Sequence, residues 1–393
     1  MKRPLLPLTV ALAISLTACT AVSPEPAPTP TPTVAASGDG ILRIGTLFAL
    51  TGDAKPQGAA QIAGVELAVR DINLAGGVNG ALVEVFHRNA VDAAAAEESW
   101  AALAEKTVDV VIGPDSTEVA AVLVPLSAAA GIPLISASSP TGDAVMSFSL
   151  ASSVAAPDAL AGVIVGEGVQ KVFAITDDGA ALGASLKAAG GDLVGSAAVT
   201  ADQTDFAALV ASAADADVIV VDSPDAVSKE AAGAIAALAA AGHPGAGFWF
   251  VGDSLRDWGR SIPVGTITDA TGFAPGAVAD AGTIKLLRQT DPGVRNTRYA
   301  VEAYDAVILA ALAATLATDD GGPSIASRLR AASEGGIPCA SYGECLDVLT
   351  TETDIDYQGL SGAVDLGDAG SPDSPSFTRY RYSAKNTPEI VLE

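Results

Sequence analysis

Short runs of β-branched and apolar residues alternate with longer Ala-rich segments along most of this chain, and no other feature constrains its fold as strongly. The run 108–112 (Val-Asp-Val-Val-Ile), for example, precedes a segment, 118–130, in which apolar residues recur every three or four positions. Runs of the first kind predict buried strands, and segments of the second kind predict amphipathic helices. Repeated strand–helix units favour parallel sheets with helices on both faces.

The alternation occurs in two series. The first series covers the predicted strands 41–45, 82–86, 108–112 and 132–135, and the second begins with 171–176. A less regular stretch near residues 145–157 separates the two series. We therefore predict an α/β fold with two lobes, each built on a parallel sheet.

The N-terminal 40 residues differ from the rest of the chain. Two basic residues precede an apolar run, 5–16, which is too short to cross a bilayer, since a spanning helix needs about 20 residues. The tripeptide 16–18 (Leu-Thr-Ala) before Cys19 resembles the lipobox of bacterial lipoproteins. The resemblance implies a signal peptide over 1–18 and a lipid on Cys19. The alternative is an ordinary signal peptide with an incidental cysteine.

Residues 19–40 are rich in Pro and Thr. Such a segment cannot bury a core and prefers an extended polyproline conformation of about 3.1 Å per residue. We interpret it as a tether. The protein is then expected to be extracytoplasmic, lipid-anchored to the outer face of the cell membrane.

The charge balance excludes one class of partner. The chain has 46 acidic and 21 basic residues, which argues against binding to nucleic acid. Its two histidines, His87 and His243, are far apart in the sequence and have no Cys or carboxylate cluster at ligand spacing, so we predict neither a metal site nor a cofactor. Cys339 and Cys345 are six residues apart, and outside the cytoplasm such a pair favours a local disulfide. A thiol-redox pair is the alternative.

A series of short motifs runs through the chain after residue 40. In their order and spacing they resemble the motifs of type I periplasmic binding proteins, the Leu/Ile/Val-binding-protein-like receptors of ABC importers. The motifs are Leu50-Thr51-Gly52, 64–69, 71–80, 111–114 (Val-Ile-Gly-Pro), 131–136 (Gly-Ile-Pro-Leu-Ile-Ser), Ala303-Tyr304-Asp305-Ala306 and 355–362 (Ile-Asp-Tyr-Gln-Gly-Leu-Ser-Gly).

The resemblance implies two Rossmann-like lobes with parallel central sheets, joined by three crossovers and closing over one small ligand. We assign residues 41–145 and 275–345 to the first lobe, and residues 146–274 and 346–393 to the second. It further implies a monomeric solute-binding lipoprotein that binds an amino-acid-like or amide-like solute and delivers it to ABC permease subunits in the membrane.

The candidate ligand-binding residues follow the third and fourth predicted strands. In open parallel sheets, ligands bind beyond the carboxyl ends of strands, where helix N-termini present amide groups. Ser116 and Thr117 occupy such a position, and the resemblance places at Thr117 a hydroxyl that binds the ligand's carboxylate. Helix capping alone is the alternative for either residue. Ser138 and Ser139 follow the next strand, in a segment where the family binds both ends of an amino acid.

Two further candidates come from the resemblance. Asp253 lies near the position where amino-acid-binding members have an acid for the ligand's ammonium, although a solvated loop Asp or a helix cap is the alternative. Gln57 lies near a position where an aromatic residue is expected, and Leu182 replaces an expected tyrosine. A different small, polar or weakly amphipathic solute is therefore as well supported as a branched-chain amino acid.

Three other functions were weighed. Residues 252–255 (Gly-Asp-Ser-Leu) match the nucleophile block of GDSL hydrolases, but no histidine follows His243 to activate Ser254, so we predict that the protein is not an enzyme. A sensor with the same fold, signalling to a membrane receptor, is the main alternative to a transport protein. An adhesive lipoprotein without a ligand is the third.

Overall fold

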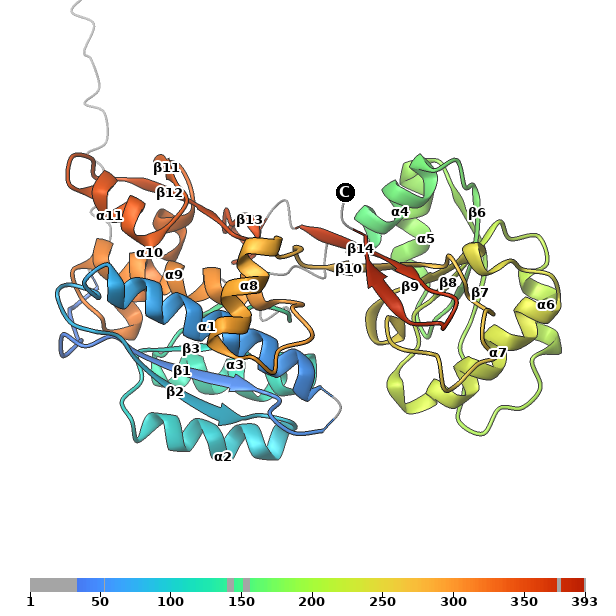
Figure 1. Cartoon of the computed structure of the whole chain (residues 1–393), viewed down its shortest axis with the longest axis horizontal. Helices are drawn as coiled ribbons and strands as arrows, with labels where there is room; N and C mark the ends of the chain where they lie inside the picture. Colours follow the sequence, from blue (N-terminus) through green and yellow to red (C-terminus); the bar gives the residue numbers. More distant parts are fainter. Residues whose placement is uncertain (1–33, 53, 140–144, 151–155, 373–375, 392–393) are drawn as a thin grey trace, which may run out of the picture. The chain divides into compact units, whose positions relative to one another are not determined.

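The structure contains three sheets within the residues that it describes. In Figure 1, a computed structural model, the described residues are 34–52, 54–139, 145–150, 156–372 and 376–391. The predicted signal peptide, Cys19 and most of the predicted tether lie outside them.

The first sheet has five parallel strands in the order β2-β1-β3-β4-β5. Its register is regular, since Ile44 pairs with Val85 on one side and Val110 on the other. Side chains alternate between the faces, so Val110 and Ile112 join one core cluster and Val111 joins another. The strands are β1 (Arg43–Phe48), β2 (Glu84–Asn89), β3 (Val110–Ile112), β4 (Leu134–Ser136) and β5 (Ser147–Ser149).

Helices cover both faces of the first sheet (Figure 1). Two of them, α1 and α9, pack on one face, and α2 and α3 on the other. The helices of this region are α1 (Lys55–Leu74), α2 (Ala93–Ala104), α3 (Thr117–Ala130), α8 (Ala281–Thr290), α9 (Ala300–Ala317), α10 (Gly322–Ser333) and α11 (Tyr342–Leu349).

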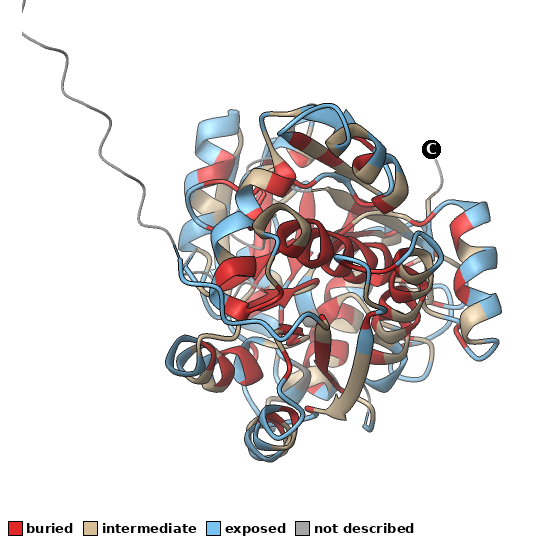
Figure 2. Ribbon diagram, turned by 90° about the vertical axis from the view of Figure 1, so that its left-hand side faces the viewer, coloured by how far each residue is buried: buried red, intermediate tan, exposed pale blue. Residues whose placement is uncertain are grey.

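Helix α9 is the centre of the first core. Every residue from 300 to 314 is buried, including seven alanines that allow α1 and α10 to approach closely. Among the described residues, α9 is the one helix long and apolar enough to cross a membrane, but 83% of it is buried inside the protein. Burial on all sides identifies α9 as a core helix (Figure 2).

The second sheet has seven strands in the order β15-β14-β10-β9-β8-β6-β7. The five strands from β10 to β7 in this order are parallel, and β14 and β15 are antiparallel. The strands are β6 (Lys171–Ile175), β7 (Asp192–Ala197), β8 (Val218–Val221), β9 (Phe248–Phe250), β10 (Thr271–Pro275), β14 (Phe377–Tyr382) and β15 (Pro388–Ile390).

Aromatic side chains fill much of the second core. The ring of Phe250 lies 5.9 Å from Trp258 and 4.7 Å from Tyr382, between centroids, on the face covered by α6 and α7. The opposite face packs against α4 and α5 through residues such as Leu160 and Leu186. These helices are α4 (Ala156–Gly166), α5 (Ala180–Ala189), α6 (Ala207–Ala213) and α7 (Ser228–Ala240).

A small third sheet, β11-β12-β13, packs with the first lobe. The predicted disulfide is present, with a Cα–Cα distance of 5.1 Å between Cys339 and Cys345, and it joins β11 to α11. The strands are β11 (Ile337–Cys339), β12 (Ile355–Gly359) and β13 (Gly362–Ala363).

The α/β fold with two parallel-dominated sheets and three crossovers agrees with the prediction. The chain leaves the first sheet after β5, returns after β10, and enters the second sheet again at β14. The packing differs from the expected lobe assignment in one place. Tyr357 and Leu366 belong to the core cluster around α9, so residues 346–366 pack with the first lobe instead of the second.

A buried carboxylate explains two of the sequence motifs. Asp305 on α9 is fully buried and accepts four hydrogen bonds, from the Tyr357 hydroxyl (2.7 Å), the amides of Leu360 (2.9 Å) and Ser361 (2.7 Å), and the Ser361 hydroxyl (2.6 Å). A side chain at Gly359 would place its Cβ 2.4 Å from this carboxylate. The motifs at 303–306 and 355–362 therefore form one structural unit, with the turn after β12 bound to α9.

The N-terminal segment 37–40 is bound to the turn between α9 and α10. Its four successive amides each donate to one carboxylate oxygen, two to Asp319 (3.2 and 2.9 Å) and two to Asp320 (3.3 and 2.9 Å). The approach is close, because a Cβ at Gly38 would lie 2.2 Å from Asp320 Oδ1 and one at Gly321 would lie 2.2 Å from Ser37 Oγ. We call this set of contacts the N-terminal clamp.

Candidate functional site

The loop between β3 and α3 forms one part of the candidate site. Gly113 has a φ of 126°, and a Cβ there would lie 2.3 Å from the carbonyl oxygen of Leu47, so the chain can turn here only with glycine. Ser116 is the N-cap of α3, and its Oγ accepts a hydrogen bond from the amide of Val119 (3.3 Å). Thr117 is the first residue of the helix and is exposed. The capping role expected as the alternative is therefore present at Ser116, and Thr117 has the more accessible hydroxyl.

Ser136 joins this loop to the next one. Its buried hydroxyl donates to the carbonyl of Pro114 (2.7 Å) and accepts from the amides of Ser138 (3.2 Å) and Ser139 (2.8 Å). The carbonyl of Ser139 is held in turn by the hydroxyl of Ser149 (2.9 Å). The loops after β3 and β4 therefore meet at the carboxyl ends of the strands of the first sheet, which we call the edge of that sheet below. Ser138 and Ser139 were the residues selected from this segment in the sequence, and Ser136 was given no role of its own.

Helix α1 carries two glutamines, Gln57 and Gln61, and Gln61 contacts the loop after β4. Gln61 is fully buried, and its Oε1 accepts a hydrogen bond from Ser138 Oγ (3.4 Å). Its Nε2 is buried without a hydrogen-bond partner in the part of the chain that the structure describes. The predicted residue, Gln57, lies one turn earlier on the same helix and is half-buried. The edge of the first sheet therefore offers hydroxyl and amide donors.

Asp115 introduces a carboxylate at this edge. It is half-buried, and its Oδ2 accepts a hydrogen bond from the amide of Ala49 (2.9 Å), which ties the ends of β1 and β3 together. Burial raises the pKa of this carboxyl above its ordinary value. An acid at the N-terminus of α3 competes with any other anion for the partial positive charge there.

The second lobe has a cavity of about 320 Å³ at the corresponding edge of its own sheet. It lies at the carboxyl ends of β6, β8, β9 and β10, beside the starts of α4 and α5. The walls are mainly apolar, and among the described lining residues the ionisable ones are both acids, Asp178 and Asp222. The lining residues are Ala156, Pro157, Leu160, Ala174, Thr176, Asp178, Ala181, Leu182, Val220, Asp222, Val251, Gly252, Phe273 and Pro275.

The structure places Asp253 beside this cavity. Asp253 belongs to the 3-10 turn Gly252–Ser254 directly after β9, and its neighbour Gly252 lines the cavity. The side chain of Asp253 lies outside the described part of the structure. Of the sequence-predicted residues, Ser116, Thr117, Ser138 and Ser139 are thus brought to one edge of the first sheet, and Asp253 to the equivalent edge of the second.

Ser254 has a structural role. It is buried, its Oγ accepts from the amide of Ser223 (2.8 Å), and it donates to the carbonyl of the same residue (3.2 Å). His243 precedes β9 and therefore lies at the amino end of that strand, whereas Ser254 follows the carboxyl end. His87 belongs to the first lobe, where its Nε2 lies 2.7 Å from Glu66 Oε1. Neither histidine is placed to activate Ser254.

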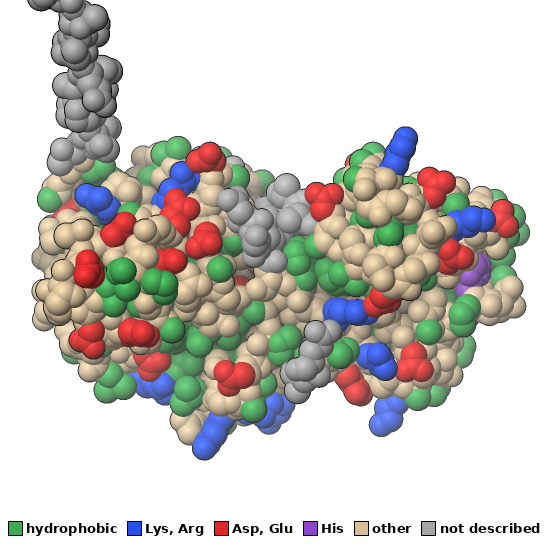
Figure 3. Space-filling model, turned by 90° about the horizontal axis from the view of Figure 1, so that it is seen from above, with side chains coloured by type: hydrophobic (Ala, Val, Ile, Leu, Met, Phe, Trp, Pro, Cys, Tyr) green, Lys and Arg blue, Asp and Glu red, His purple; other side chains and the backbone are tan. Residues whose placement is uncertain are grey.

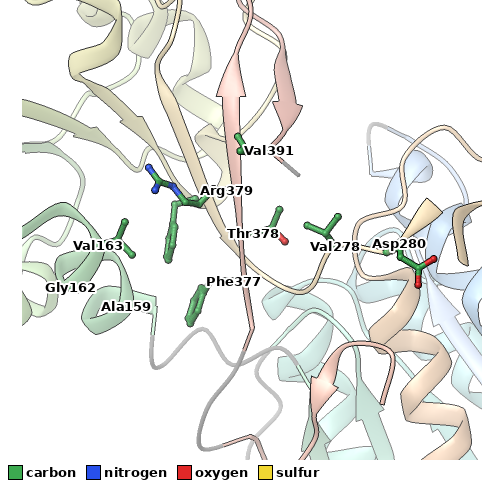
Figure 4. A pocket seen from close by; sticks show the side chains of 11 residues that line it. Ala159, Gly162, Val163, Val278, Asp280, Phe377, Thr378, Arg379 and Val391 are labelled. Atoms are coloured by element: carbon green, nitrogen blue, oxygen red, sulfur yellow. The ribbon is translucent and has the colours of Figure 1, made fainter. Parts of the chain in front are cut away.

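A second and larger cavity, of about 780 Å³, lies between α4 and β14 (Figure 4). The rings of Phe273 and Phe377 stack in it with centroids 5.0 Å apart. Arg379 is already engaged, because its guanidinium contacts Glu167 Oε1 at 2.5 Å and lies over the Trp249 ring at 5.5 Å. The guanidinium of Arg379 thus already has partners within the protein, so this cavity is a weaker candidate for the ligand-binding site than the smaller one.

The surface agrees with the charge balance of the sequence. On the face shown in Figure 3, acidic and basic side chains are interspersed with apolar ones and form no continuous basic patch. This face therefore offers no basic track for a phosphate backbone.

Residues 41–338 match the family model named "Periplasmic binding protein". The chain belongs to the periplasmic binding protein family. This family consists of solute-binding proteins that are not enzymes and that work outside the cytoplasm. The resemblance found in the sequence, to type I members of the family, is therefore confirmed.

Solved structures with the same fold come from ABC transport systems. The branched-chain amino acid transporter substrate-binding protein LivJ of Streptococcus pneumoniae, in complex with isoleucine, is 20% identical, with a TM-score of 0.63 over 89% of this chain and 99% of that one. A substrate-binding protein of Desulfitobacterium hafniense, in complex with Leu, is 17% identical, with a TM-score of 0.68 over 89% of this chain and 100% of that one. A solute-binding protein of R. palustris, in complex with benzoate, is 18% identical, with a TM-score of 0.60 over 90% of this chain and 96% of that one.

A curated relative has a different role. The substrate-binding protein BasB of a chemotactic signal transduction system, from Halobacterium salinarum, is 26% identical over 150 residues. The match spans about a third of each protein, 35% of this chain and 36% of BasB.

Proposed function

We propose that this chain is the solute-binding lipoprotein of an ABC importer. It binds a small amino-acid-like or amide-like solute by clam-shell closure and delivers it to permease subunits in the membrane. In this proposal it acts as a monomer, anchored through a lipid on Cys19 to the outer face of the cell membrane. The single observation that best supports the proposal is the Ser136 hydroxyl, which holds two hydroxyl-rich loops together at the edge of the sheet where such a ligand would bind.

The first lobe captures the solute's hydrogen-bond acceptor. The hydroxyls of Thr117 and Ser138, the amides at the start of α3 and the buried Nε2 of Gln61 are donors that suit a carboxylate or amide oxygen. Ser139 is buried and contributes mainly through its backbone, whereas Ser116 keeps the helix N-terminus in place. Gln57 borders this edge from α1.

The second lobe completes the site on closure. Its cavity at the ends of β6, β8 and β9 takes the solute's apolar part, and the acids Asp178 and Asp222 belong to its lining. Asp253, in the turn beside the cavity, stays the predicted partner of the solute's N–H groups. Closure removes water, which strengthens each polar contact because the local dielectric constant falls. A ligand that binds the closed form better shifts the population toward that form, which a permease can recognise.

A thermal-shift screen of the purified full-length protein tests this proposal. Amino acids, short amides and small carboxylic acids would be added singly, and a ligand at 100 times its Kd should stabilise the protein by about 2.7 kcal/mol. The variants Thr117→Val and Ser138→Ala should reduce the shift. Ser212→Ala, on the exposed side of α6, is the matched control and should leave it unchanged. If no compound of these classes raises the melting temperature, the proposal is wrong.

A ligand sensor of the same fold is the second candidate, because the curated relative BasB is part of a chemotactic signal transduction system. The two functions differ in what a deletion of the gene removes. A transport protein is required for uptake of its radiolabelled solute, whereas a sensor is required only for the cell's response to that solute. Normal uptake in the deletion strain would favour the sensor.

A further inference from the structure

We propose that the first lobe binds an uncharged carboxamide end of the solute and discriminates against a carboxylate, and that Asp115 sets this preference. The inference rests on the proposed function and narrows its solute class from amino-acid-like or amide-like to amide-like. Three observations support it: the place of Asp115 at the start of α3, the contacts that hold it there, and the lack of a cation paired with it among the described residues.

Asp115 lies where an anion would bind to the end of α3. It directly precedes the N-cap Ser116, and its Cα is at most about 7.6 Å from that of Thr117, since consecutive Cα atoms are about 3.8 Å apart. The amides at a helix N-terminus carry a partial positive charge that favours an anion. At α3 this charge already faces two acids of the chain, Asp115 and Glu118 in the first turn. A carboxylate of the solute would add a third negative charge.

Contacts on two sides hold the carboxylate of Asp115 at this edge of the first sheet. Its Oδ2 accepts a hydrogen bond from the amide of Ala49 (2.9 Å). Ala49 lies in turn against α1, because a Cβ at Gly58 would be only 2.1 Å from its carbonyl oxygen. On the other side, the carbonyl of Pro114 accepts a hydrogen bond from the hydroxyl of Ser136 (2.7 Å). Asp115 therefore cannot turn away from the edge without losing its bond to the end of β1.

A buried hydrogen-bond donor belongs to the same edge. Gln61 lies about one turn after Gly58 on α1 and is fully buried. Its Oε1 accepts a hydrogen bond from Ser138 Oγ (3.4 Å), so its amide group lies against the loop after β4. The Nε2 atom of the same amide has no hydrogen-bond partner within the described part of the chain. A buried donor without a partner is costly, and an oxygen of the solute supplies the partner that it lacks.

No cation pairs with Asp115 among the described residues. Burial raises the pKa of its carboxyl, and the groups that lower this pKa are backbone amides, those of Ala49 and of Asp115 itself. The sequence contains no Lys, Arg or His between Lys106 and Lys171, a stretch that includes β3, α3, β4 and both loops. The two loops therefore contain no cation that would offset the charge of Asp115.

Two cations belong to the neighbouring elements. Lys55 is the first residue of α1 and is exposed, so water and salt screen its charge. Arg88 lies near the end of β2, and its Nη1 donates to the carbonyl of His87 (2.8 Å). Neither of them contributes to the pKa of Asp115. Because Lys55 has the more accessible charge, it is included in the test below.

A carboxamide suits this set of groups better than a carboxylate of the same shape. The amide oxygen accepts hydrogen bonds from Gln61 Nε2 and from the exposed hydroxyl of Thr117 without bringing a charge. A carboxylate would lose its hydration beside a fixed acid and gain no ion pair in return. Because the two groups differ by one charge and very little in volume, pairs of amides and acids are the sharpest probes of the inference.

Two matched pairs of probes test the inference. They are isovaleramide with isovalerate, and benzamide with benzoate, and the Kd of each for the full-length protein would be measured by calorimetry at pH 8. In a pair that binds, the amide should bind at least tenfold more tightly than the acid. Raising the NaCl concentration from about 50 mM to about 500 mM should strengthen binding of the acid and leave that of the amide nearly unchanged, because salt screens the repulsion.

Variants at the two ends of β3 assign the effect to Asp115. Asp115→Asn removes the charge and keeps an acceptor for the amide of Ala49, so it should tighten binding of the acid about tenfold and change that of the amide less than about threefold. Asp109→Asn is the matched control, because Asp109 is a half-buried acid before β3 that accepts a hydrogen bond from the amide of Arg43 (2.8 Å). It should change neither Kd. If Asp115→Asn does not fold, the salt dependence of the parent protein still decides.

Lys55→Gln tests whether an exposed cation offsets the acid. The ratio of the two Kd values in a pair should change less than about threefold. The inference is wrong if an acid binds as tightly as its amide, if Asp115→Asn binds the acid no better than the parent protein does, or if Lys55→Gln weakens binding of the acid tenfold.

The same measurements separate this inference from the function on which it rests. If an acid binds more tightly than its amide, or if neither pair binds while another compound from the broader screen does, the solute-binding function stands and the inference fails. If nothing binds in either experiment, both fail.

Discussion

The two parts of the candidate site, the loops after β3 and β4 in the first lobe and the cavity of about 320 Å³ in the second, are built by different physical means. We call them the first and the second candidate half-site. In the first lobe, hydrogen bonds fix the geometry, since one serine hydroxyl connects the loops after β3 and β4. In the second lobe, packing fixes it, since apolar side chains form a cavity and only its rim is charged. The first half-site is therefore suited to recognising the position of one polar group, whereas the second is suited to selecting by size and charge.

Phe273→Ala should have the largest effect on this comparison. The ring is almost fully buried, stacks on Phe377 and lines both second-lobe cavities, so its removal should destabilise the protein by about 3–5 kcal/mol. Denaturant unfolding measures the loss. Phe273→Leu, which keeps most of the volume, should cost much less. A loss below 1 kcal/mol for the alanine variant would show that packing does not hold the second half-site.

The crossover between β10 and α8 gives a pH-dependent prediction. Glu302 is fully buried, and its Oε1 accepts a hydrogen bond from the amide of Ala277 (2.5 Å). Burial raises the pKa of this carboxyl from 4.5 to about 7. The folded state then holds a proton that the unfolded state loses, so stability is greatest below pH 4.5 for this group and falls as pH rises to 7.

The expected loss from Glu302 is on the order of 2–3 kcal/mol between pH 4.5 and 7.5. Glu302→Gln keeps an oxygen acceptor for the Ala277 amide and should remove this part of the pH dependence. Urea unfolding midpoints at several pH values measure the effect. Asp109, whose pKa burial also raises to about 7, contributes in the same direction, so Asp109→Asn is the companion variant. Equal pH profiles for the parent and both variants would contradict the assignment.

Ser136→Ala should reduce stability less than the variants above and should, in addition, weaken solute binding. The change leaves the Pro114 carbonyl and two loop amides without their partner, which costs about 1–3 kcal/mol. Solute affinity should fall by tenfold or more, because the two loops are no longer held together. Ser127→Ala, which removes a buried hydroxyl bonded to Ile132 O (2.7 Å) away from these loops, is the control for stability alone. Unchanged affinity in Ser136→Ala would break the comparison drawn above.

The smallest effect is expected from shortening the N-terminus. A protein that begins at residue 34 keeps the N-terminal clamp, whereas one that begins at residue 41 loses it. Two of these hydrogen bonds are exposed and two are partly buried, so the shorter protein should be less stable by about 1 kcal/mol. Melting temperatures of the two proteins measure the difference. Asp319→Asn and Asp320→Asn in the longer protein should reproduce part of it.

Local patterns in the sequence were enough to predict the fold. They predicted only some of the residues of the candidate site. Runs such as 108–112 were read correctly as buried strands, because periodicity and β-branched content are local properties. The role of Ser136 depends on which two loops meet, and no local pattern contains that information. Asp178 and Asp222 were missed because an acid after a strand is common, and its meaning appears only with the cavity beside it.

The clamp shows a different limit of sequence reasoning. Residues 37–40 were assigned to the tether together with the Pro- and Thr-rich residues that precede them. Their fixed position comes from backbone amides that donate to two carboxylates 280 and 281 positions later in the chain. Composition describes side chains, and it therefore cannot reveal a contact that the main chain makes.

The N-terminal clamp is also the first contact of the folded domain that a force applied to the N-terminus would reach. A pull on residues before Ser37 reaches Asp319 and Asp320 first, and then passes along α9 into the first core. Nothing in that route passes through the strands of the second sheet. If the protein is anchored by its N-terminus as proposed, closure of the second lobe would therefore place no load on this attachment.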